Sequence, residues 1–279
     1  MISLINILDD EEIISNAKKS LEYKGYFIVR NALTEQNYLS CREEALSFFK
    51  EKIFNLGKIN YALRGDVAAG MHDNIGFEKN NSWHLYRYCS FKWNRTPSSI
   101  SNIIRTSNIL SRLRNIINNM EQNAGEFIED NNYITYTSIS LYPKNGGFLN
   151  KHRDAHPTTD EPSVIHCKFE LTHKGKDYSE GGFYIIDRQG KEINISEIAQ
   201  PRDVILFDGT LFHEIKPIKG GDLGRIAVFD IPTFVTNSSR LSIYSGDGFS
   251  LPKKIITKIL SNGSYFPKKI FQYFLNLLG

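Results

Sequence analysis

The sequence predicts an α+β protein in which a helical N-terminal part precedes a β-sandwich or β-barrel core. Helical patterns occupy much of the first 120 residues, and from about residue 132 the chain changes to short β-branched and aromatic runs separated by Gly, Pro and Asp. Many short strands at this density are typical of all-β sandwiches and barrels. We expect a single domain with a helical part at 1–131, a β-core at 132–236 and amphipathic helices at 237–279.

The first helix is predicted at residues 9–24, where acidic residues precede apolar residues at helical spacing. Gly25 stops this pattern, and the run YFIVRNAL then indicates a strand. Thr34 is a candidate N-cap for a second helix at 35–54, and a third helix is predicted at 101–120.

Residues 61–95 show no sustained period and are rich in Gly, Asn and aromatic residues, so we expect an irregular loop. Long loops inside compact domains are often functional. Arg64, His84 and Arg87 lie in this segment and are candidate contacts for a substrate. The alternative for all three is an ordinary packed or solvated loop.

The β-core is predicted from runs that are rich in β-branched and aromatic residues and end at turn-forming residues. These runs lie at 132–143, 163–173, 181–187, 191–196, 203–209, 213–218 and 225–234. In the tail, Pro252 and Pro267 each precede two lysines and an apolar stripe, which is typical of basic amphipathic helices. Such helices can lie on a membrane surface, but packing against the core or a second subunit is favoured here.

Composition excludes several classes of partner. A net charge of +3 over 279 residues offers no clustered basic face, so nucleic acid is not expected as a partner. The three cysteines have no C-x-x-C spacing, which argues against a disulfide framework and a cysteine zinc site. No apolar run is long enough to span a membrane, and acidic residues 9–12 interrupt any signal peptide. We therefore expect a cytoplasmic protein without an integral membrane segment.

A candidate metal site begins in the segment FLNKHRDAHP, which contains His152 and Asp154. In a strand, residues i and i+2 point to the same face, so this imidazole and carboxylate would lie together. His213 follows the apolar run VILFDGTLF later in the chain. Two histidines and one carboxylate form the facial triad of non-haem Fe(II) oxygenases. The alternatives are a polar turn with two unrelated side chains, or a cluster in which His156 competes as a ligand.

Arg225 lies twelve residues after His213 and opens the run RIAVFDI. A guanidinium binds carboxylates through two hydrogen bonds and stays charged when it is buried. A cosubstrate that chelates iron at one end and carries a carboxylate at the other would need such a partner.

With these residues in place, the segment from about 136 to 232 resembles the Fe(II)/2-oxoglutarate-dependent dioxygenases, with a phytanoyl-CoA-dioxygenase-like and prolyl-hydroxylase-like pattern. The motifs LYPKNGGFLNKHRD, SEGGFYI, PRDVILFDGTLFHEI and GRIAVFDI follow the order of that family. The earlier run KGYFIVRNALTEQNYLSCREEA resembles the opening of phytanoyl-CoA-dioxygenase-like members. The resemblance implies a double-stranded β-helix (jelly-roll) core with helices packed around it, mainly from the N-terminal third.

The resemblance also implies roles for individual residues. The residues that would hold the iron are His152, Asp154 and His213. Arg225 would pair with the distal carboxylate of 2-oxoglutarate, and Tyr142 would add a hydroxyl hydrogen bond, with Tyr136 as the alternative. Many members carry Ser or Thr two residues after the arginine, where this chain has Ala227.

The implied reaction uses Fe(II), 2-oxoglutarate and O2, and decarboxylates 2-oxoglutarate to succinate. It would hydroxylate, or otherwise oxidise, an unactivated C–H bond of a small-molecule substrate. Because Asp154 is present, hydroxylation, desaturation or ring formation is favoured over halogenation. Members that repair nucleic acids carry a second arginine six residues after the first, where this chain has Ile231.

Two alternatives remain open at the level of sequence. The first is a cupin-type metalloenzyme that does not use oxoglutarate, because such enzymes share the jelly-roll scaffold. The second is a degenerate, non-catalytic binding protein with a basic, membrane-facing tail. His166 and His173 lie in a predicted strand, where we expect structural histidines with satisfied hydrogen bonds.

Overall fold

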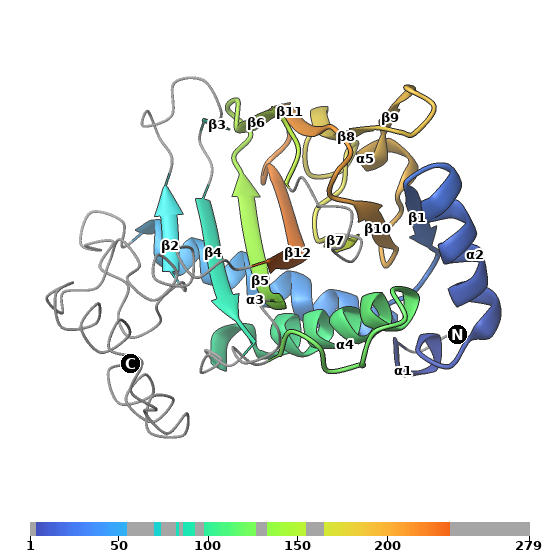
Figure 1. Ribbon diagram of the computed structural model, residues 1–279. Coiled ribbons are helices and arrows are strands. Elements are labelled where there is room, and N and C mark those ends of the chain that lie inside the picture. Colours follow the sequence, from blue (N-terminus) through green and yellow to red (C-terminus); the bar gives the residue numbers. More distant parts are fainter. Residues whose placement is uncertain are drawn as a thin grey trace, which may run out of the picture.

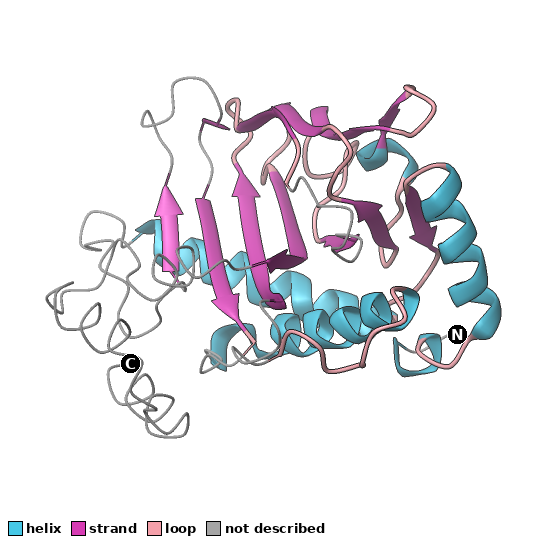
Figure 2. Cartoon of the chain, in the orientation of Figure 1, coloured by secondary structure: helices cyan, strands magenta, loops and turns pink. Residues whose placement is uncertain are grey.

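The structure is a computed structural model and describes residues 4–54, 70–73, 82–83, 86–92, 98–126, 133–154 and 165–234. These residues form two antiparallel β-sheets and several helices, as Figures 1 and 2 show. Within these ranges, no helix combines the length and apolarity that crossing a membrane requires. The tail helices expected at 237–279 and the candidate residues Arg64, His84 and His156 lie outside the described residues.

The helices in the N-terminal half are α1 (Leu4–Ile7), α2 (Glu11–Tyr23), α3 (Glu35–Phe54), η2 (Ser98–Ile100) and α4 (Ser101–Ile117), and α5 (Ile195–Ile198) follows later. The three predicted helices, α2, α3 and α4, begin and end close to where the sequence predicts them, whereas α1, η2 and α5 were not predicted. The Asp10 side chain caps α2 by accepting from the Ile13 N–H at 2.9 Å. Thr34 accepts from the Asn37 N–H at 3.2 Å and so caps α3.

Gly25 lies just past the end of α2 with φ +82°, a left-handed conformation that favours glycine. A Cβ at this position would lie 2.5 Å from Cδ1 of Leu211, so that side chain would have to move to make room for it. The Gly25 carbonyl accepts from the Asp208 N–H at 2.9 Å. The end of the first long helix is therefore in contact with the turn that precedes His213.

The larger sheet has seven strands in the order β1-β10-β7-β12-β5-β4-β2. Their bounds are β1 (Tyr26–Val29), β10 (Val204–Asp208), β7 (Ile165–Glu170), β12 (Arg225–Phe234), β5 (Tyr133–Tyr142), β4 (Tyr86–Phe91) and β2 (Gly70–Asp73). The smaller sheet has the order β3-β6-β11-β8-β9. Its strands are β3 (Ser82–Trp83), β6 (Phe148–His152), β11 (His213–Lys219), β8 (Glu180–Ile186) and β9 (Glu192–Asn194).

The expectation of an irregular loop at 61–95 is wrong for part of this segment, because β2, β3 and β4 lie within it. The β4 strand pairs with β5 along its whole length, from Tyr86 opposite Leu141 to Phe91 opposite Tyr136. Its order therefore comes from hydrogen bonds to a strand far away in the sequence. A search for local periodicity does not detect such pairing.

The hydrophobic core has two layers, one on each face of the larger sheet. Alternate side chains of β5, β7 and β12, such as Ile139, Phe169 and Val228, pack with apolar residues of α2, α3 and α4. The opposite face meets the smaller sheet, where Phe183 of β8 packs edge-on against Phe207 of β10 at 5.2 Å between ring centroids. Figure 1 shows α3 and α4 on one side of the larger sheet and the strands of the smaller sheet across its other side.

Candidate metal centre

The two predicted ligand histidines meet across the smaller sheet. His152 ends β6 and His213 begins β11, and the two residues are direct partners in the antiparallel register. Their ring centroids are 4.4 Å apart. His213 is buried, whereas the side chain of His152 is about one-third exposed. Residues 61 positions apart in the sequence are thus brought together by strand pairing alone.

Backbone carbonyls orient both rings. Nδ1 of His152 lies 2.6 Å from the carbonyl oxygen of Asn150, and Nδ1 of His213 lies 2.9 Å from that of Leu211. A carbonyl can only accept a hydrogen bond, so each Nδ1 carries the proton. A neutral imidazole has one N–H, which leaves the lone pair on each Nε2. This is the arrangement in which metal-binding histidines are usually held.

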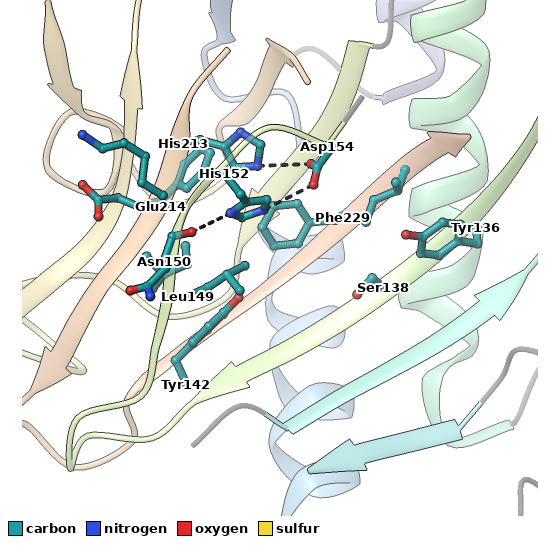
Figure 3. A pocket seen from close by; sticks show the side chains of 14 residues that line it. Tyr136, Ser138, Tyr142, Leu149, Asn150, His152, Asp154, His213, Glu214 and Phe229 are labelled. Carbon is teal, nitrogen blue, oxygen red and sulfur yellow. Dashed lines mark hydrogen bonds and ion pairs between the residues drawn. The ribbon is translucent and has the colours of Figure 1, made fainter. Parts of the chain in front are cut away.

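Asp154 completes the cluster, although it lies beyond the end of β6. Its backbone N–H donates to the carbonyl of Gly209 at 3.0 Å, which ties it to the turn before His213. Its Oδ1 lies 3.3 Å from Nε2 of His152, and its Oδ2 lies 3.1 Å from Nε2 of His213. Figure 3 shows both imidazoles directed at this carboxylate. One potential ligand atom from each of the three residues lies within 4.8 Å of the others.

The electrostatics of the cluster favour the ionised carboxylate. Loss of hydration would by itself raise the pKa of Asp154, but attraction to His166, His152 and His213 in their protonated forms outweighs it. The pKa of Asp154 is therefore held well below its usual range. The group is a carboxylate at neutral pH and can act as a metal ligand.

A cavity of about 350 Å³ opens beside the three residues and lies between the two sheets. Its walls combine apolar side chains with a few polar groups, as is usual for small-molecule sites. The lining residues outside the cluster are Tyr136, Ser138, Tyr142, Leu149, Asn150, Lys151, Phe183, Glu214, Ile215, Phe229 and Ile231. In Figure 3, Tyr142 lies near His152, while Tyr136 and Ser138 lie further along the larger sheet.

Arg225 is buried behind this cavity. Its guanidinium carbon lies 5.5 Å from the ring centroid of Tyr142 and 5.7 Å from that of Phe183, both of which line the cavity. Its Nη2 donates to Oε1 of Glu170 at 2.9 Å. Among the described residues, its Nε and Nη1 have no hydrogen-bond partner. Two donors of a buried cation are therefore available to a further acceptor.

Glu170 also pairs with a second buried cation that the sequence analysis did not single out. Nζ of Lys168 lies 2.9 Å from Oε1 of Glu170 and 3.4 Å from the ring centroid of Phe183. Burial opposes ionisation of Glu170, but Lys168 and Arg225 outweigh it and hold its pKa well below the usual range. Burial, together with the charge of Arg225, lowers the pKa of Lys168. Two basic side chains, Lys168 and Arg225, thus lie against the single carboxylate of Glu170.

The other predicted residues take different positions. Tyr142 is opposite Arg225 in the β5–β12 register, close to the predicted arginine, whereas Tyr136 is opposite Ile231. Ala227 is fully buried on β12 and supplies no donor. The backbone of Arg87 pairs with Ser140 in β4, but its side chain lies outside the described residues.

The expectation for the two structural histidines is right for His173 and wrong for His166. Nε2 of His173 makes a hydrogen bond with the Tyr38 hydroxyl at 3.0 Å. His166 has no hydrogen-bond partner among the described residues, and its Nδ1 lies 3.6 Å from Oδ2 of Asp154. The alternation of IHCKFE in β7 was the available signal, because one face carries His166, Lys168 and Glu170.

Comparison with known proteins gives a fold but no close relative. No family model matches the chain, and no curated protein matches it. Among solved structures, a protein from Caulobacter crescentus assigned to the 2OG-Fe(II) oxygenase family is 12% identical with a TM-score of 0.55. That match covers 94% of this chain and 98% of the other.

Two further structures extend this likeness. A prolyl hydroxylase from Trichoplax adhaerens, in complex with a hypoxia inducible factor peptide fragment, is 14% identical with a TM-score of 0.51. The match covers 82% of this chain and 92% of the prolyl hydroxylase chain. JOX2 in complex with 2OG, Fe and JA is 15% identical, has a TM-score of 0.50, and covers 84% of this chain and 74% of its own. The chain therefore shares its fold with solved structures of Fe(II)/2-oxoglutarate-dependent oxygenases, which is the fold that the resemblance in its motifs implies.

Proposed function

We propose that the protein is a cytoplasmic, non-haem Fe(II)- and 2-oxoglutarate-dependent oxygenase that hydroxylates, or otherwise oxidises, an unactivated C–H bond of a small molecule. Its two sheets would form the double-stranded β-helix of that superfamily within a single domain. The observation that carries the proposal is the convergence of His152, Asp154 and His213 beside a cavity, with their ligand atoms within 4.8 Å of one another.

The donor set fits a divalent iron ion. Both Nε2 lone pairs face carboxylate oxygens at 3.1–3.3 Å, so acceptors face acceptors. A cation between them resolves this repulsion. Two imidazoles and one carboxylate are the ligands of the non-haem iron triad, and they leave further coordination positions open. When bound there with 2-oxoglutarate and O2, the iron supplies the oxidising power that protein side chains lack.

The buried cations support a diacid cosubstrate. The unused Nε and Nη1 donors of Arg225 match a carboxylate, which accepts two parallel hydrogen bonds from a guanidinium. Lys168 and Arg225 both lie against one internal carboxylate, Glu170, so this buried region favours anionic groups. The proposed hydroxyl donor is Tyr142, because its ring centroid lies 5.5 Å from the guanidinium carbon of Arg225.

The cavity walls support a role in orienting the substrate and excluding water. Phe183, Phe229 and Ile231 form an apolar side, and Ser138 and Asn150 offer polar groups for orientation. Excluding water strengthens electrostatic interactions inside a site and limits side reactions. Since Asp154 is retained as a ligand, hydroxylation, desaturation or ring formation is favoured over halogenation. Arg64, His84 and Arg87 remain proposed substrate contacts.

Turnover of the cosubstrate tests the proposal. The purified protein with Fe(II), ascorbate and O2 should convert 2-oxoglutarate to succinate, slowly without substrate and faster with a substrate from a metabolite library. Replacing Asp154 by glycine should abolish substrate hydroxylation. Protein that binds no divalent metal through His152, Asp154 and His213 would refute the assignment.

Arg225→Ala should weaken 2-oxoglutarate binding. Loss of one member of a buried charge pair costs about 3–5 kcal/mol, which corresponds to roughly two to four orders of magnitude in affinity. Isothermal titration of the metal-loaded protein with 2-oxoglutarate measures this change. Arg105→Ala is the matched control, because Arg105 is exposed on α4. Unchanged affinity in Arg225→Ala would count against the role of this arginine.

One contact supports a second candidate, a cupin-type metalloenzyme that does not use oxoglutarate. Glu170 already occupies one nitrogen of Arg225, and Ala227 supplies no further donor for a diacid. If the metal-loaded protein binds no 2-oxoglutarate but still oxidises or isomerises a library compound, this second candidate is correct.

A further inference from the structure

His166 is a buried histidine whose neighbours leave it without an evident structural role. It lies in β7, where its ring packs against Phe207 with 5.0 Å between centroids and an interplanar angle of 35°. Neither ring nitrogen has a hydrogen-bond partner in the described part of the chain. Buried polar groups are normally paired, and each exception calls for an explanation.

The nearest charged group to which this ring is directed is the carboxylate of Asp154. Nδ1 of His166 lies 3.6 Å from Oδ2 of Asp154, the oxygen that also faces His213. This separation is longer than a hydrogen bond. The Asp154 side chain is about one-third exposed, so its carboxylate has room to rotate. A displacement of Oδ2 by a few tenths of an ångström toward His166 would bring the two atoms within hydrogen-bond distance.

The two ligand histidines cannot act as donors to this carboxylate once a metal is bound. Their Nδ1 protons are directed to the carbonyls of Asn150 and Leu211, and their Nε2 lone pairs face the carboxylate across the proposed metal position. His166 is not constrained in this way, because no other acceptor competes for its N–H among the described residues. A neutral imidazole has one N–H, so no change in its protonation is required.

We propose that His166 is a positioning residue for the metal site: it donates a hydrogen bond to Oδ2 of Asp154, so that only Oδ1 binds the metal. A carboxylate that binds through one oxygen leaves one more coordination position open than a carboxylate that binds through both. His166 therefore preserves an open position for cosubstrate or O2. This inference rests on the proposed function, because it assumes that Asp154 is a metal ligand.

Two substitutions at this position separate the hydrogen bond from packing. His166→Phe keeps an aromatic ring against Phe207 and removes the donor. His166→Asn places an amide N–H near the position of Nδ1 and restores the donor. His173→Phe is the matched control, because it replaces a buried histidine that binds Tyr38 instead of the metal ligands. Circular dichroism melting establishes that each variant is folded.

The first measurement is anaerobic titration of each variant with Fe(II), and with Co(II) as a spectroscopic substitute. Groups that orient metal ligands typically contribute about 10- to 100-fold to metal affinity. His166→Phe should lose affinity by about that factor, His166→Asn should recover most of it, and His173→Phe should match the wild type. The Co(II) visible spectrum should change in His166→Phe, as a second carboxylate oxygen joins the metal, and return in His166→Asn.

The outcomes separate this inference from the proposed function. If the wild type binds metal through His152, Asp154 and His213 but His166→Phe binds equally well with an unchanged spectrum, the positioning role is overturned and the oxygenase assignment stands. If His166→Asn loses metal as severely as His166→Phe and its spectrum shows one nitrogen ligand fewer, His166 is itself a ligand, which also overturns the positioning role. If the wild type binds no metal, the proposed function fails first.

Discussion

Asp208 organises the turn that carries His213. Its Oδ1 accepts from the N–H of Thr210 at 2.9 Å and from the Thr210 hydroxyl at 2.7 Å, and its Oδ2 pairs with Arg188. In the same turn, the carbonyl of Gly209 accepts from the N–H of Asp154. One carboxylate thus stabilises the segment that holds two of the three proposed ligands. Local side-chain to backbone bonds of this kind are a usual role of aspartate in turns.

At this scale we predict that Asp208→Ala weakens both the fold and the metal site. Buried donors that lose their acceptor cost about 1–3 kcal/mol, so the free energy of unfolding in urea should fall by about that amount. Affinity for Co(II) should fall as well, because the turn would no longer fix His213. Asp208→Asn keeps an acceptor oxygen, so its free energy of unfolding and its Co(II) affinity should lie between those of Asp208→Ala and those of the wild type. Asp222→Ala, at an exposed position, is the control. Wild-type stability in Asp208→Ala would show that Asp208 does not hold the turn.

The next scale is the packing of α4 against the outer face of β12. Ser107, Ser111 and Arg114 lie on one face of α4, since residues at these spacings are neighbours on a helix. Ser107 and Ser111 donate to Oδ2 of Asp230 at 2.9 and 2.6 Å. Arg114 and Lys92 also pair with Asp230, and all three charged side chains are buried. A single acidic side chain therefore pairs with two buried basic side chains between helix and sheet.

We predict that Asp230→Ala destabilises the protein strongly. Removing one member of a buried charge network typically costs about 3–5 kcal/mol, because the remaining charges lose their partner. Ser111→Ala removes one hydrogen bond and should cost about 1 kcal/mol. Urea unfolding followed by circular dichroism compares both with Glu121→Ala, which alters an exposed residue. Equal losses in Asp230→Ala and Ser111→Ala would contradict a charge role for Asp230.

At the scale of the whole molecule, the larger sheet separates two kinds of interior. One face packs on the helices through apolar side chains, with the Asp230 network among them. The other face meets the smaller sheet (Figure 1). The cavity and the buried pairing of Glu170 with Arg225 lie on this side. Buried carboxylates therefore lie on both sides of one sheet, and both are paired with cations. Their ionisation links the stability of the whole fold to pH.

We predict that stability decreases as the pH is lowered through the acid range. Burial opposes ionisation of Asp230, but Lys92 and Arg114 outweigh it and lower its pKa from 3.8 to about 2. The pKa of Glu170 is also lowered, from its usual 4.5. A carboxyl group whose pKa is lower in the folded state than in the unfolded state binds protons more readily when the protein is unfolded. Its contribution to the free energy of unfolding is therefore complete only above its unfolded-state pKa. That contribution is lost as the pH falls through the folded pKa.

Melting temperatures of the metal-free protein between pH 6 and pH 2 measure this dependence. The wild type should change little above about pH 5 and lose stability steeply below about pH 4. Asp230→Asn has no carboxylate to protonate at this position. Its melting temperature should be lower than that of the wild type at pH 6 and should fall less steeply as the pH is lowered. A slope as steep as that of the wild type would exclude Asp230 as a source of the acid sensitivity.

The sequence by itself determined the long helices, the strands of the core and the order of the candidate ligands. These features depend on local patterns: an acidic helix start, Gly25 after α2, Thr34 as a cap, and alternation in the β-core. His152 and His213 were identifiable because each stands beside a strand-like run. The sequence predicted that Arg225 would pair with a carboxylate of a bound cosubstrate. In the structure its carboxylate partner is a residue of the protein itself, Glu170.

Only the tertiary structure decided which face of each strand points between the sheets. In β7, alternation separates His166, Lys168 and Glu170 from Cys167 and Phe169, but it does not say which set meets the helices. Packing against α4 places the apolar set outside and the ionisable set inside. Likewise, β4 gains its order from β5, and Asp154 reaches the cluster through a hydrogen bond to Gly209. These contacts join residues distant in sequence, which local patterns cannot encode.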